Sequence, residues 1–315
     1  MAEHKFPWGD TRRFNSYTSY FKKKFGTRVQ KLSLNAGFTC PNRDGTISTG
    51  GCNFCLNEAF NPSYCDPLKP ILTQINEGIE FHTTRYRRAE KYIAYFQAYS
   101  NTHKPVEELK EIYSQALDHP LVSGIVIGTR PDCIDERKLD YFAELSEKTC
   151  LIIEYGIESC YNKTLESLNR GHKFEQTVQA LEETAKRGIH TGGHIIFGLP
   201  GESQNEMLDE AEILSGLKLN SIKFHQLQIF KGTVMEKQFS DNPEKFNLFQ
   251  PEEYIDFIIK FTERLNPAIV IERFASETPP RYLANGTGWD IRNYIFLQMI
   301  EKKMEELDTW QGKKY

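Results

Sequence analysis

Long apolar runs are absent from this 315-residue sequence, and its first residues, MAEHKFPWGDTRRF, lack the apolar core of a secretion signal. The sequence also contains no low-complexity tract and no repeat at the periods of solenoid proteins. These absences argue against membrane-spanning and repeat architectures. We therefore expect a cytoplasmic protein that has no membrane partner.

Cysteine is scarce, odd in number and unevenly placed, with seven residues in the chain. A disulfide framework is not expected, because a reducing compartment does not maintain one. Three scattered cysteines are expected to be free thiols within the fold: Cys133, Cys150 and Cys160. A second group lies in the polar segment NAGFTCPNRDGTISTGGCNFCLNEAF (35–60), at Cys40, Cys52 and Cys55.

Positive charge is concentrated near the N-terminus. Residues 1–31 carry eight Lys or Arg against two acidic residues, a balance of +6, so the remaining chain carries −10. Cations alternate with aromatic residues in RRFNSYTSYFKKKFGTR (12–28), a mixture that suits nucleic acid because cations neutralise phosphates and rings stack on bases. A solvated helix face is the alternative interpretation.

Strand-like and helix-like stretches alternate from residue 29 onward. One helix-like stretch opens with Ser203 and Glu206 at capping-box spacing, and another starts at Pro251. The strand-like runs cover residues 29–35, 92–99, 122–128, 150–157, 190–198, 221–230 and 268–274. Repeated strand–helix units predict a parallel sheet covered by helices, and so many units in series favour a barrel.

The predicted fold is therefore α/β, a partial (β/α)6 TIM-like barrel at residues 29–275. We expect a basic N-terminal extension at 1–28 and a C-terminal helical extension at 276–315. Chemistry in such a barrel takes place at the C-terminal ends of the strands. The cysteine segment, QAYSNTH, GTRPD, GIES and FGLPGE each follow one of the first five strands, which predicts one active site on one rim.

The cysteine spacing indicates a metal centre. Eleven residues separate Cys40 from Cys52 and two separate Cys52 from Cys55, and two thiolates so close in sequence can hold one metal. Zinc is one interpretation, with Cys65 as the fourth ligand. We favour an iron–sulfur cluster, because only one cysteine pair is present and three ligands leave one iron of a 4Fe–4S cluster open to a cofactor. Phe54, directly before Cys55, could pack against a planar base.

The chain resembles the radical S-adenosylmethionine superfamily. The resemblance rests on the segment GFTCPNRDGTISTGGCNFC and on the strand–helix units that follow it. Within this superfamily, the chain is similar to the elongator-type branch, which shares the long first gap, and to the YtqA/YhcC-like bacterial proteins. The resemblance implies one 4Fe–4S cluster, S-adenosylmethionine, and reductive cleavage of the latter to a 5′-deoxyadenosyl radical. It also implies an electron donor such as flavodoxin or ferredoxin.

The resemblance assigns roles to individual residues. It implies that Cys40, Cys52 and Cys55 ligate iron and that Phe54 lies near the adenine. The remaining cofactor contacts that it implies are Tyr99 and Ser100 for the methionyl amine, Glu158 and Arg170 for the ribose and the carboxylate, and His194 on the ribose side. Taken singly, Glu158, Arg170 and His194 could instead be structural residues.

Two substrates are considered. The elongator-type resemblance implies a tRNA-modifying enzyme acting on the C5 side chain of a wobble uridine, for example converting carboxymethylaminomethyl to aminomethyl. The basic stretches 12–31 and RYRRAEK (85–91) favour tRNA as a partner, with candidate substrate contacts at Lys22, Lys23, Lys24, His225, Gln228 and Lys231. A radical enzyme acting on a small molecule and a zinc-stabilised RNA-binding protein are the alternatives.

Overall fold

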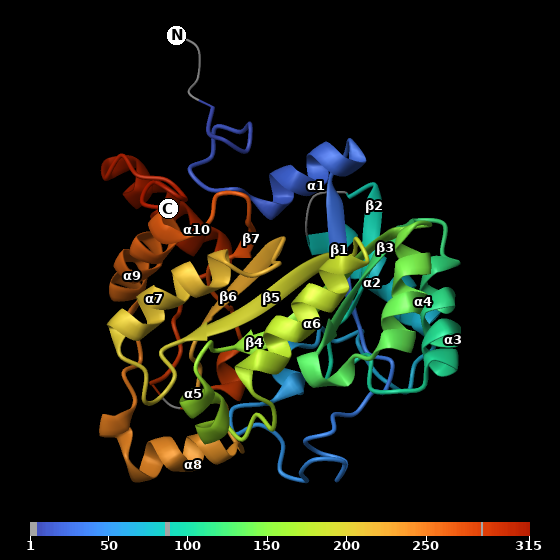
Figure 1. Ribbon diagram of the computed structural model, residues 1–315, viewed down its shortest axis with the longest axis horizontal. Helices are drawn as coiled ribbons and strands as arrows, with labels where there is room; N and C mark the ends of the chain where they lie inside the picture. Colours follow the sequence, from blue (N-terminus) through green and yellow to red (C-terminus); the bar gives the residue numbers. More distant parts are fainter. Residues whose placement is uncertain (1–4, 86–88, 285) are drawn as a thin grey trace.

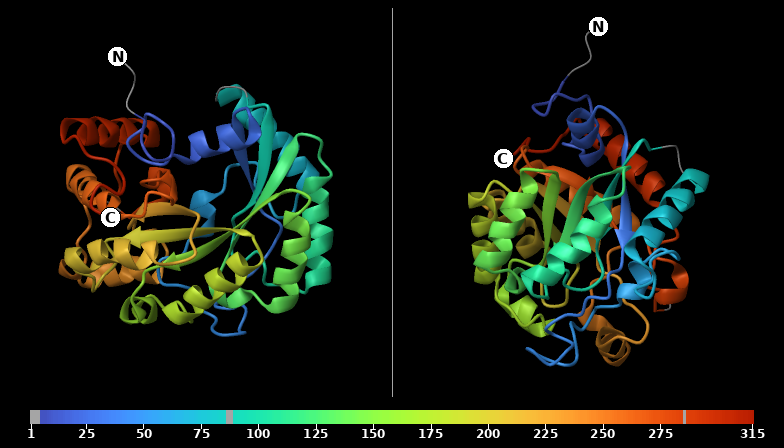
Figure 2. Two further views of the ribbon diagram at one scale, coloured as in Figure 1. Left: turned by 45° about the horizontal axis from the view of Figure 1, so that its top comes forward. Right: turned by 90° about the vertical axis from the view of Figure 1, so that its right-hand side faces the viewer.

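The computed structural model describes residues 5–85, 89–284 and 286–315, and in this part of the chain seven parallel strands form one sheet. The strands lie side by side in sequence order: β1 (Val29–Leu34), β2 (Lys91–Phe96), β3 (Val122–Thr129), β4 (Cys150–Glu158), β5 (His190–Phe197), β6 (Ser221–Gln226) and β7 (Val270–Arg273). The sheet curves into an open half-barrel (Figure 2). The expected partial barrel is confirmed, with the seventh strand-like run completing the sheet.

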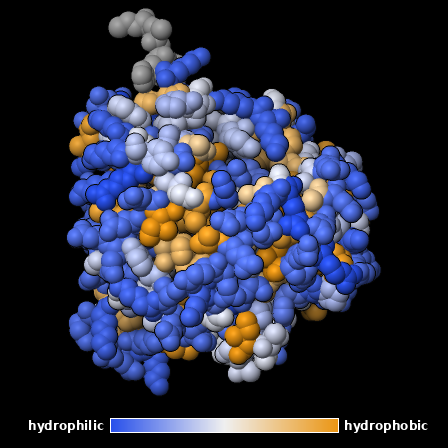
Figure 3. Space-filling model, viewed as in Figure 1, coloured by the Kyte–Doolittle hydropathy of each residue, from blue (hydrophilic) through white to orange (hydrophobic). Residues whose placement is uncertain are grey.

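Helices cover the outer face of the sheet (Figure 1). They are α2 (Ile71–Arg85), α3 (Val106–Leu117), α4 (Glu136–Ser146), α6 (Phe174–Lys186), α7 (Gln204–Ser215) and α9 (Pro251–Arg264), with α10 (Asn293–Glu306) packed on α9. The short helices α5 (Asn162–Ser167) and α8 (Val234–Asp241) follow the ends of β4 and β6. The face seen in Figure 3 is largely hydrophilic, with apolar side chains visible only in patches. In the described part of the chain, no helix combines the length and apolar character needed to span a bilayer.

Local sequence signals account for several of these elements. The predicted capping box is present at α7, where Ser203 Oγ accepts a hydrogen bond from the Glu206 N–H and the Glu206 carboxylate accepts one from the Ser203 N–H at 2.8 Å. The helix α9 begins at Pro251, as expected. The N–H of a first helical residue has no hydrogen-bond partner within the helix, so proline, which lacks this N–H, loses nothing there.

Two strands end earlier than their apolar runs. Strand β2 stops at Phe96 rather than residue 99, and the chain turns at Tyr99, which adopts the left-handed conformation with φ at +64°. Strand β6 stops at Gln226 rather than residue 230. The following residues pair with another segment instead, and the Ala284 N–H donates to the Ile229 carbonyl at 2.8 Å.

The N-terminal helix α1 (Tyr17–Phe25) covers the end of the half-barrel where the strands begin. Its Phe21 is buried and packs against Ile93, Val126 and Ile152, which are barrel residues of β2, β3 and β4. The Tyr20 ring lies 5.8 Å from that of His190, the first residue of β5. Rings in the basic segment therefore pack against the barrel, where the sequence pattern had suggested base stacking.

Four charged side chains form a closed ring inside the half-barrel. Lys31 of β1 contacts Glu154 of β4 and Glu272 of β7 at 2.6 Å each, and Lys223 of β6 contacts the same carboxylates at 2.9 and 3.1 Å. Burial alone would raise the pKa of Glu154, but Lys223, Lys31 and His194 hold it well below its ordinary value. Because β1 and β7 are the edges of the sheet, the Lys31–Glu272 pair joins the two sides of the opening.

Replacing Lys31 by Met should destabilise the protein, because Glu154 and Glu272 both lose a cation while remaining inside the barrel. Removing one partner of a buried ion pair costs about 3–5 kcal/mol in the free energy of unfolding. Urea denaturation measures the loss, and the exposed Lys218→Met serves as the control, with an expected change within about 0.5 kcal/mol.

The same comparison should depend on pH. A carboxyl whose pKa is lowered by folding contributes stability above its unfolded pKa and loses it as the pH falls through the folded value. The difference in the free energy of unfolding between the parent and Lys31→Met should therefore become smaller at acidic pH. Equal urea midpoints for Lys31→Met and Lys218→Met at neutral pH would contradict a stabilising role for the ring.

Candidate active site

A cavity opens at the C-terminal ends of the strands, between the cysteine segment and β2 to β6. Sequence-predicted residues far apart in the chain line it together: Cys40, Cys52, Phe54, Cys55, Tyr99, Ser100, Glu158, Arg170, His194, His225 and Gln228. All three predicted iron ligands and all six predicted cofactor contacts therefore lie around one space.

Four predicted substrate contacts lie elsewhere. Lys22, Lys23 and Lys24 are exposed on α1, at the opposite end of the strands, and Lys23 Nζ donates to the Trp8 carbonyl at 2.7 Å. Lys231 is exposed beyond β6 and does not line the cavity. Residues 86–88 of the second basic stretch lie outside the described residues.

The cysteine segment is held in place by hydrogen bonds to distant loops. The main-chain N–H and side-chain amide of Asn53 donate to the carbonyls of Leu168 and Ser167, at 3.0 and 2.8 Å. Its own carbonyl accepts from Met235 N–H at the start of α8, at 2.9 Å. These contacts order a Gly- and Asn-rich loop that has no helix or strand between residues 35 and 56.

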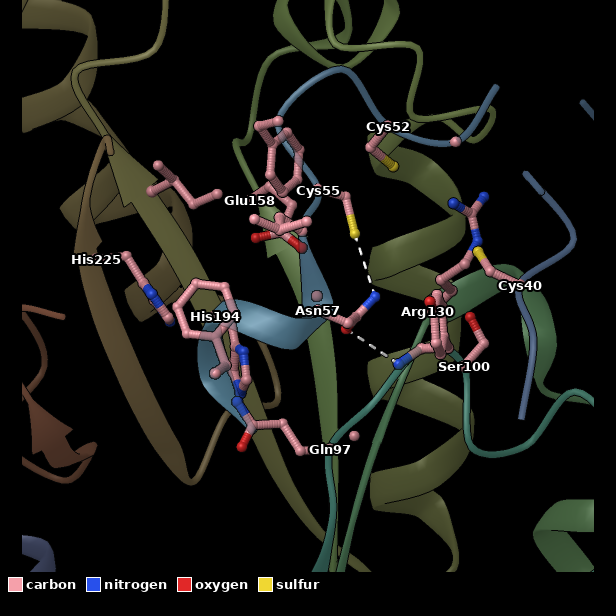
Figure 4. A pocket seen from close by; sticks show the side chains of 18 of the residues that line it. Cys40, Cys52, Cys55, Asn57, Gln97, Ser100, Arg130, Glu158, His194 and His225 are labelled. Atoms are coloured by element: carbon pink, nitrogen blue, oxygen red, sulfur yellow. Dashed lines mark hydrogen bonds between the residues drawn. The ribbon is translucent and has the colours of Figure 1, made fainter. Parts of the chain in front are cut away.

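The sulfur atoms of Cys40, Cys52 and Cys55 surround a common space (Figure 4). Arg170 Nη1 donates to Cys52 Sγ at 3.5 Å, and Asn57 Nδ2 donates to Cys55 Sγ at 3.4 Å. Burial and the neighbouring Cys52 raise the pKa of the Cys55 thiol to about 11. A thiolate at this position therefore requires a cationic partner such as a metal, which deprotonates a coordinating thiol.

The arrangement does not favour a zinc site. Zinc ligands surround a single ion at about 2.0–2.3 Å, whereas no three His, Cys, Asp or Glu side chains in the described ranges come close enough to share one metal ion. Cys65, the candidate fourth ligand, is buried beside β1, where its Sγ donates to the Ser33 carbonyl at 3.2 Å. A cluster gives each cysteine its own iron, so it does not require the three sulfur atoms to share one ion.

Arg170 and Glu158 form an ion pair on the cavity wall. Arg170 is 6% exposed, and its Nη2 lies 3.2 Å from Glu158 Oε1 and donates to the Gly156 carbonyl at 2.7 Å. Burial alone would lower the pKa of Arg170, but Cys52 and Glu158 raise it above its ordinary value. A β-carbon at residue 156 would lie 2.5 Å from both charged groups, so a larger residue there would displace the ends of both side chains from this arrangement.

The loop after β2 places the hydroxyl of Ser100 at the cavity, where it can accept a hydrogen bond from a ligand. Ser100 is 1% exposed, lines the cavity, and its hydroxyl makes no hydrogen bond of ordinary geometry with the described residues. A buried hydroxyl without a partner is costly, so such a group suits a polar ligand. The preceding Tyr99 is left-handed, and its N–H donates to Asn57 Oδ1 at 3.2 Å.

Two histidines face the inside of the barrel. His194 Nε2 lies 2.9 Å from Glu154 Oε2, and His225 contacts Arg273 Nη2 at 2.9 Å. Burial lowers the pKa of both imidazoles, assisted by Lys223 at His194 and by Arg273 at His225. Both rings are therefore neutral near pH 7, and they add polar but uncharged groups to the cavity.

Several cavity residues were missed by the sequence analysis, and three of them are polar or charged groups of particular interest. Glu154 interrupts the apolar run CLIIEYGI, and this charge within a buried strand was a usable signal. Arg130 lies in the strand-end motif GTRPD, is 2% exposed and leaves its Nη1 without a partner among the described residues. Asn57 has no local signal, because its importance comes only from contacts made in space.

Comparison with known families and structures agrees with this geometry. A family model described as the radical SAM superfamily matches residues 40–214, and a model of the radical SAM C-terminal domain matches residues 219–306. The YtqA protein of Bacillus subtilis is 34% identical to this chain over an alignment of 319 residues, gaps included, and the alignment covers 99% of this chain and 96% of YtqA.

More distant similarity extends to elongator-type proteins. A tRNA uridine(34) acetyltransferase from Methanocaldococcus infernus is 24% identical over 64% of this chain, which spans 37% of that protein. The solved structure of the archaeal Methanocaldococcus infernus Elp3 superimposes with a TM-score of 0.66 at 17% identity, over 90% of this chain and 64% of that chain. This likeness shows a shared fold. A family match over more than half of the chain and a full-length relative at 34% identity show that this protein belongs to the radical S-adenosylmethionine superfamily, whose enzymes use a 4Fe–4S cluster and S-adenosylmethionine.

Proposed function

We propose that Cys40, Cys52 and Cys55 hold the 4Fe–4S cluster and that S-adenosylmethionine binds beside it. The observation that carries the proposal is that three cysteine sulfurs, the unpaired Ser100 hydroxyl and the Glu158–Arg170 pair line one cavity. When bound, these cofactors supply one-electron cleavage chemistry that produces an organic radical. The chain's own residues bind, orient and exclude water.

Each end of S-adenosylmethionine has a complementary group in the cavity. The methionyl ammonium needs acceptors, and the hydroxyl of Ser100 is one, beside Tyr99. The carboxylate suits Arg170, whose Nε has no partner in the described part of the chain. The ribose hydroxyls suit Glu158 and His194, and the adenine suits the apolar wall that Phe54 shares.

We further propose that the substrate is the C5 side chain of a wobble uridine in tRNA, with carboxymethylaminomethyl converted to aminomethyl as the example. Support comes from the similarity to a tRNA uridine(34) acetyltransferase and from the basic N-terminal segment. Because this chain spans 37% of that relative, we do not carry over the acetyl transfer.

The cavity has polar groups available for a base turned out of an RNA strand. Gln228 is buried on the cavity wall, and one end of its amide is taken by the Thr278 hydroxyl at 2.8 Å. We assign the NH2 end of the amide to the edge of such a base, which enzymes that flip bases read by hydrogen bonds. His225 lies on the same side of the cavity.

Contacts to the RNA phosphates are assigned to Lys22, Lys23 and Lys24. Lys231, which follows β6 on the rim that carries the cavity, remains a candidate at the mouth, and all four lysines are exposed. Because the first three are at the opposite end of the strands from Lys231 and the cavity, an RNA that contacts both must pass along the side of the barrel. This separation is the observation that favours the second candidate, a radical enzyme acting on a small molecule.

The cluster assignment predicts which cysteines matter. Cys40→Ser, Cys52→Ser and Cys55→Ser should each lose the brown 4Fe–4S cluster after anaerobic reconstitution, because three thiolates leave no redundancy. Iron content and the visible absorbance measure the loss. Cys65→Ser, Cys133→Ser, Cys150→Ser and Cys160→Ser are the controls and should retain the cluster. Stoichiometric zinc without iron in protein purified anaerobically would contradict the assignment.

The cofactor assignment predicts a separate phenotype for Arg170 and Glu158. Arg170→Ala and Glu158→Gln should weaken S-adenosylmethionine binding by about tenfold or more, because charge-assisted hydrogen bonds are lost. Equilibrium dialysis measures the dissociation constant, and unchanged cluster absorbance shows that the iron site survives. The exposed Arg264→Ala should bind like the parent. If all three variants bind equally well, the cofactor lies elsewhere.

The tRNA assignment predicts a change in cellular RNA. Nucleoside mass spectrometry of tRNA from a strain lacking the protein should show an altered wobble-uridine side chain, with its precursor accumulating. In vitro, replacing Lys22, Lys23 and Lys24 by Ala should flatten the salt dependence of tRNA binding, because fewer counterions are released. An unchanged nucleoside profile together with no tRNA binding at low salt would favour the small-molecule candidate.

A further inference from the structure

Asn57 connects the two sides of the cavity that would face the cluster and the cofactor. It is the first residue of the short 3-10 helix η1 (Asn57–Phe60), two residues after Cys55. Its Nδ2 donates to Cys55 Sγ at 3.4 Å, and its Oδ1 accepts from the Tyr99 N–H at 3.2 Å, as the dashed lines of Figure 4 show. One amide thus joins the cysteine segment to the end of β2.

The residue that Asn57 holds is strained. Tyr99 has φ at +64°, and the left-handed conformation costs a residue with a β-carbon about 1–2 kcal/mol. Neighbouring contacts hold this turn from both sides. The Ser100 N–H donates to the Thr39 carbonyl at 3.2 Å, and the Arg43 guanidinium lies 5.7 Å from the Tyr99 ring centre.

The chemistry of Asn57 suits both of its contacts. A carboxamide is both a hydrogen-bond donor and an acceptor, whereas an ionised Asp could accept from Tyr99 but could not donate to sulfur. The Arg43 guanidinium adds a second link, because its Nη2 donates to the Cys55 carbonyl at 3.0 Å. The turn at Tyr99 and Ser100 is therefore built against the cysteine segment.

We propose that Asn57 is a positioning residue for S-adenosylmethionine. It holds the Tyr99 main chain left-handed, so that the Ser100 hydroxyl and the adjoining main chain face the methionyl ammonium. Where a glycine could adopt this turn without strain, this chain uses Tyr99 and a side-chain amide contributed by another loop. The inference rests on the placement of S-adenosylmethionine proposed above.

The test is a double-mutant cycle between Asn57 and Tyr99, read out as S-adenosylmethionine affinity of the cluster-loaded protein. Asn57→Ala should raise the dissociation constant about five- to tenfold, the range expected for a lost buried hydrogen bond. Tyr99→Gly supplies the reference affinity for the second arm of the cycle, because glycine enters the left-handed region freely and needs no contact to hold it there. Asn57→Ala combined with Tyr99→Gly should recover to within about twofold of Tyr99→Gly alone.

Matched controls separate this role from others. Asn205→Ala, an exposed amide on α7, should bind like the parent. Asn57→Asp keeps the acceptor for the Tyr99 N–H but not the donor to Cys55 Sγ. It should bind S-adenosylmethionine within about threefold of the parent, while an EPR-monitored redox titration shows a lower cluster potential.

Three outcomes would overturn the proposal. Parent-like binding by Asn57→Ala would show that the contact between Asn57 and Tyr99 does not affect S-adenosylmethionine binding. A double mutant as weak as Asn57→Ala, with a shifted cluster potential, would assign Asn57 to Cys55 rather than to Tyr99. Loss of the cluster in both Asn57 variants would assign it to cluster assembly. Parent-like binding by Arg170→Ala and Glu158→Gln would instead contradict the placement of the cofactor itself.

Discussion

The ring of Lys31, Glu154, Lys223 and Glu272 is the constraint on which the half-barrel depends. The strand order leaves β1 and β7 at the two edges of the sheet, and the Lys31–Glu272 contact of 2.6 Å joins them where no ladder does. TIM barrels fill the same space with layers of branched apolar side chains. Here two lysines and two glutamates occupy it, and Glu154 in turn orients His194 at the floor of the cavity.

The charge ring also divides the molecule into a closed end and an open end. Below the ring, α1 packs Phe21 into the barrel, and Ser16 pairs with Ile271 of β7, so the N-terminal segment seals the end where strands begin. On the side of the ring toward the C-terminal ends of the strands, no helix of the described residues fills the barrel. The cysteine segment lies across the mouth and leaves a cavity beneath it. The cavity is therefore polar at its floor and lined with sulfur at its mouth.

Positions that are conformationally unfavourable gather around this cavity. Both Tyr99 and Glu158 have positive φ values, at +64° and +67°, at the ends of β2 and β4. Strain of this kind persists only where surrounding contacts over-determine it, and it is concentrated at functional sites. Asn57 holds the first of these residues, and the Arg170 ion pair engages the side chain of the second.

The sequence by itself determined the parallel strand–helix order, the grouping of Cys40, Cys52 and Cys55, and the rim on which the cavity lies, because these depend on local periodicity and on residues adjacent in the chain. Strand-end motifs also predicted Ser100, Glu158 and Arg170, which line the cavity. Only the tertiary structure decided that Cys65 lies apart, that the basic α1 closes the far end, and that Asn57 contacts Tyr99. These contacts join residues between 32 and 131 positions apart, where no local pattern constrains the distance.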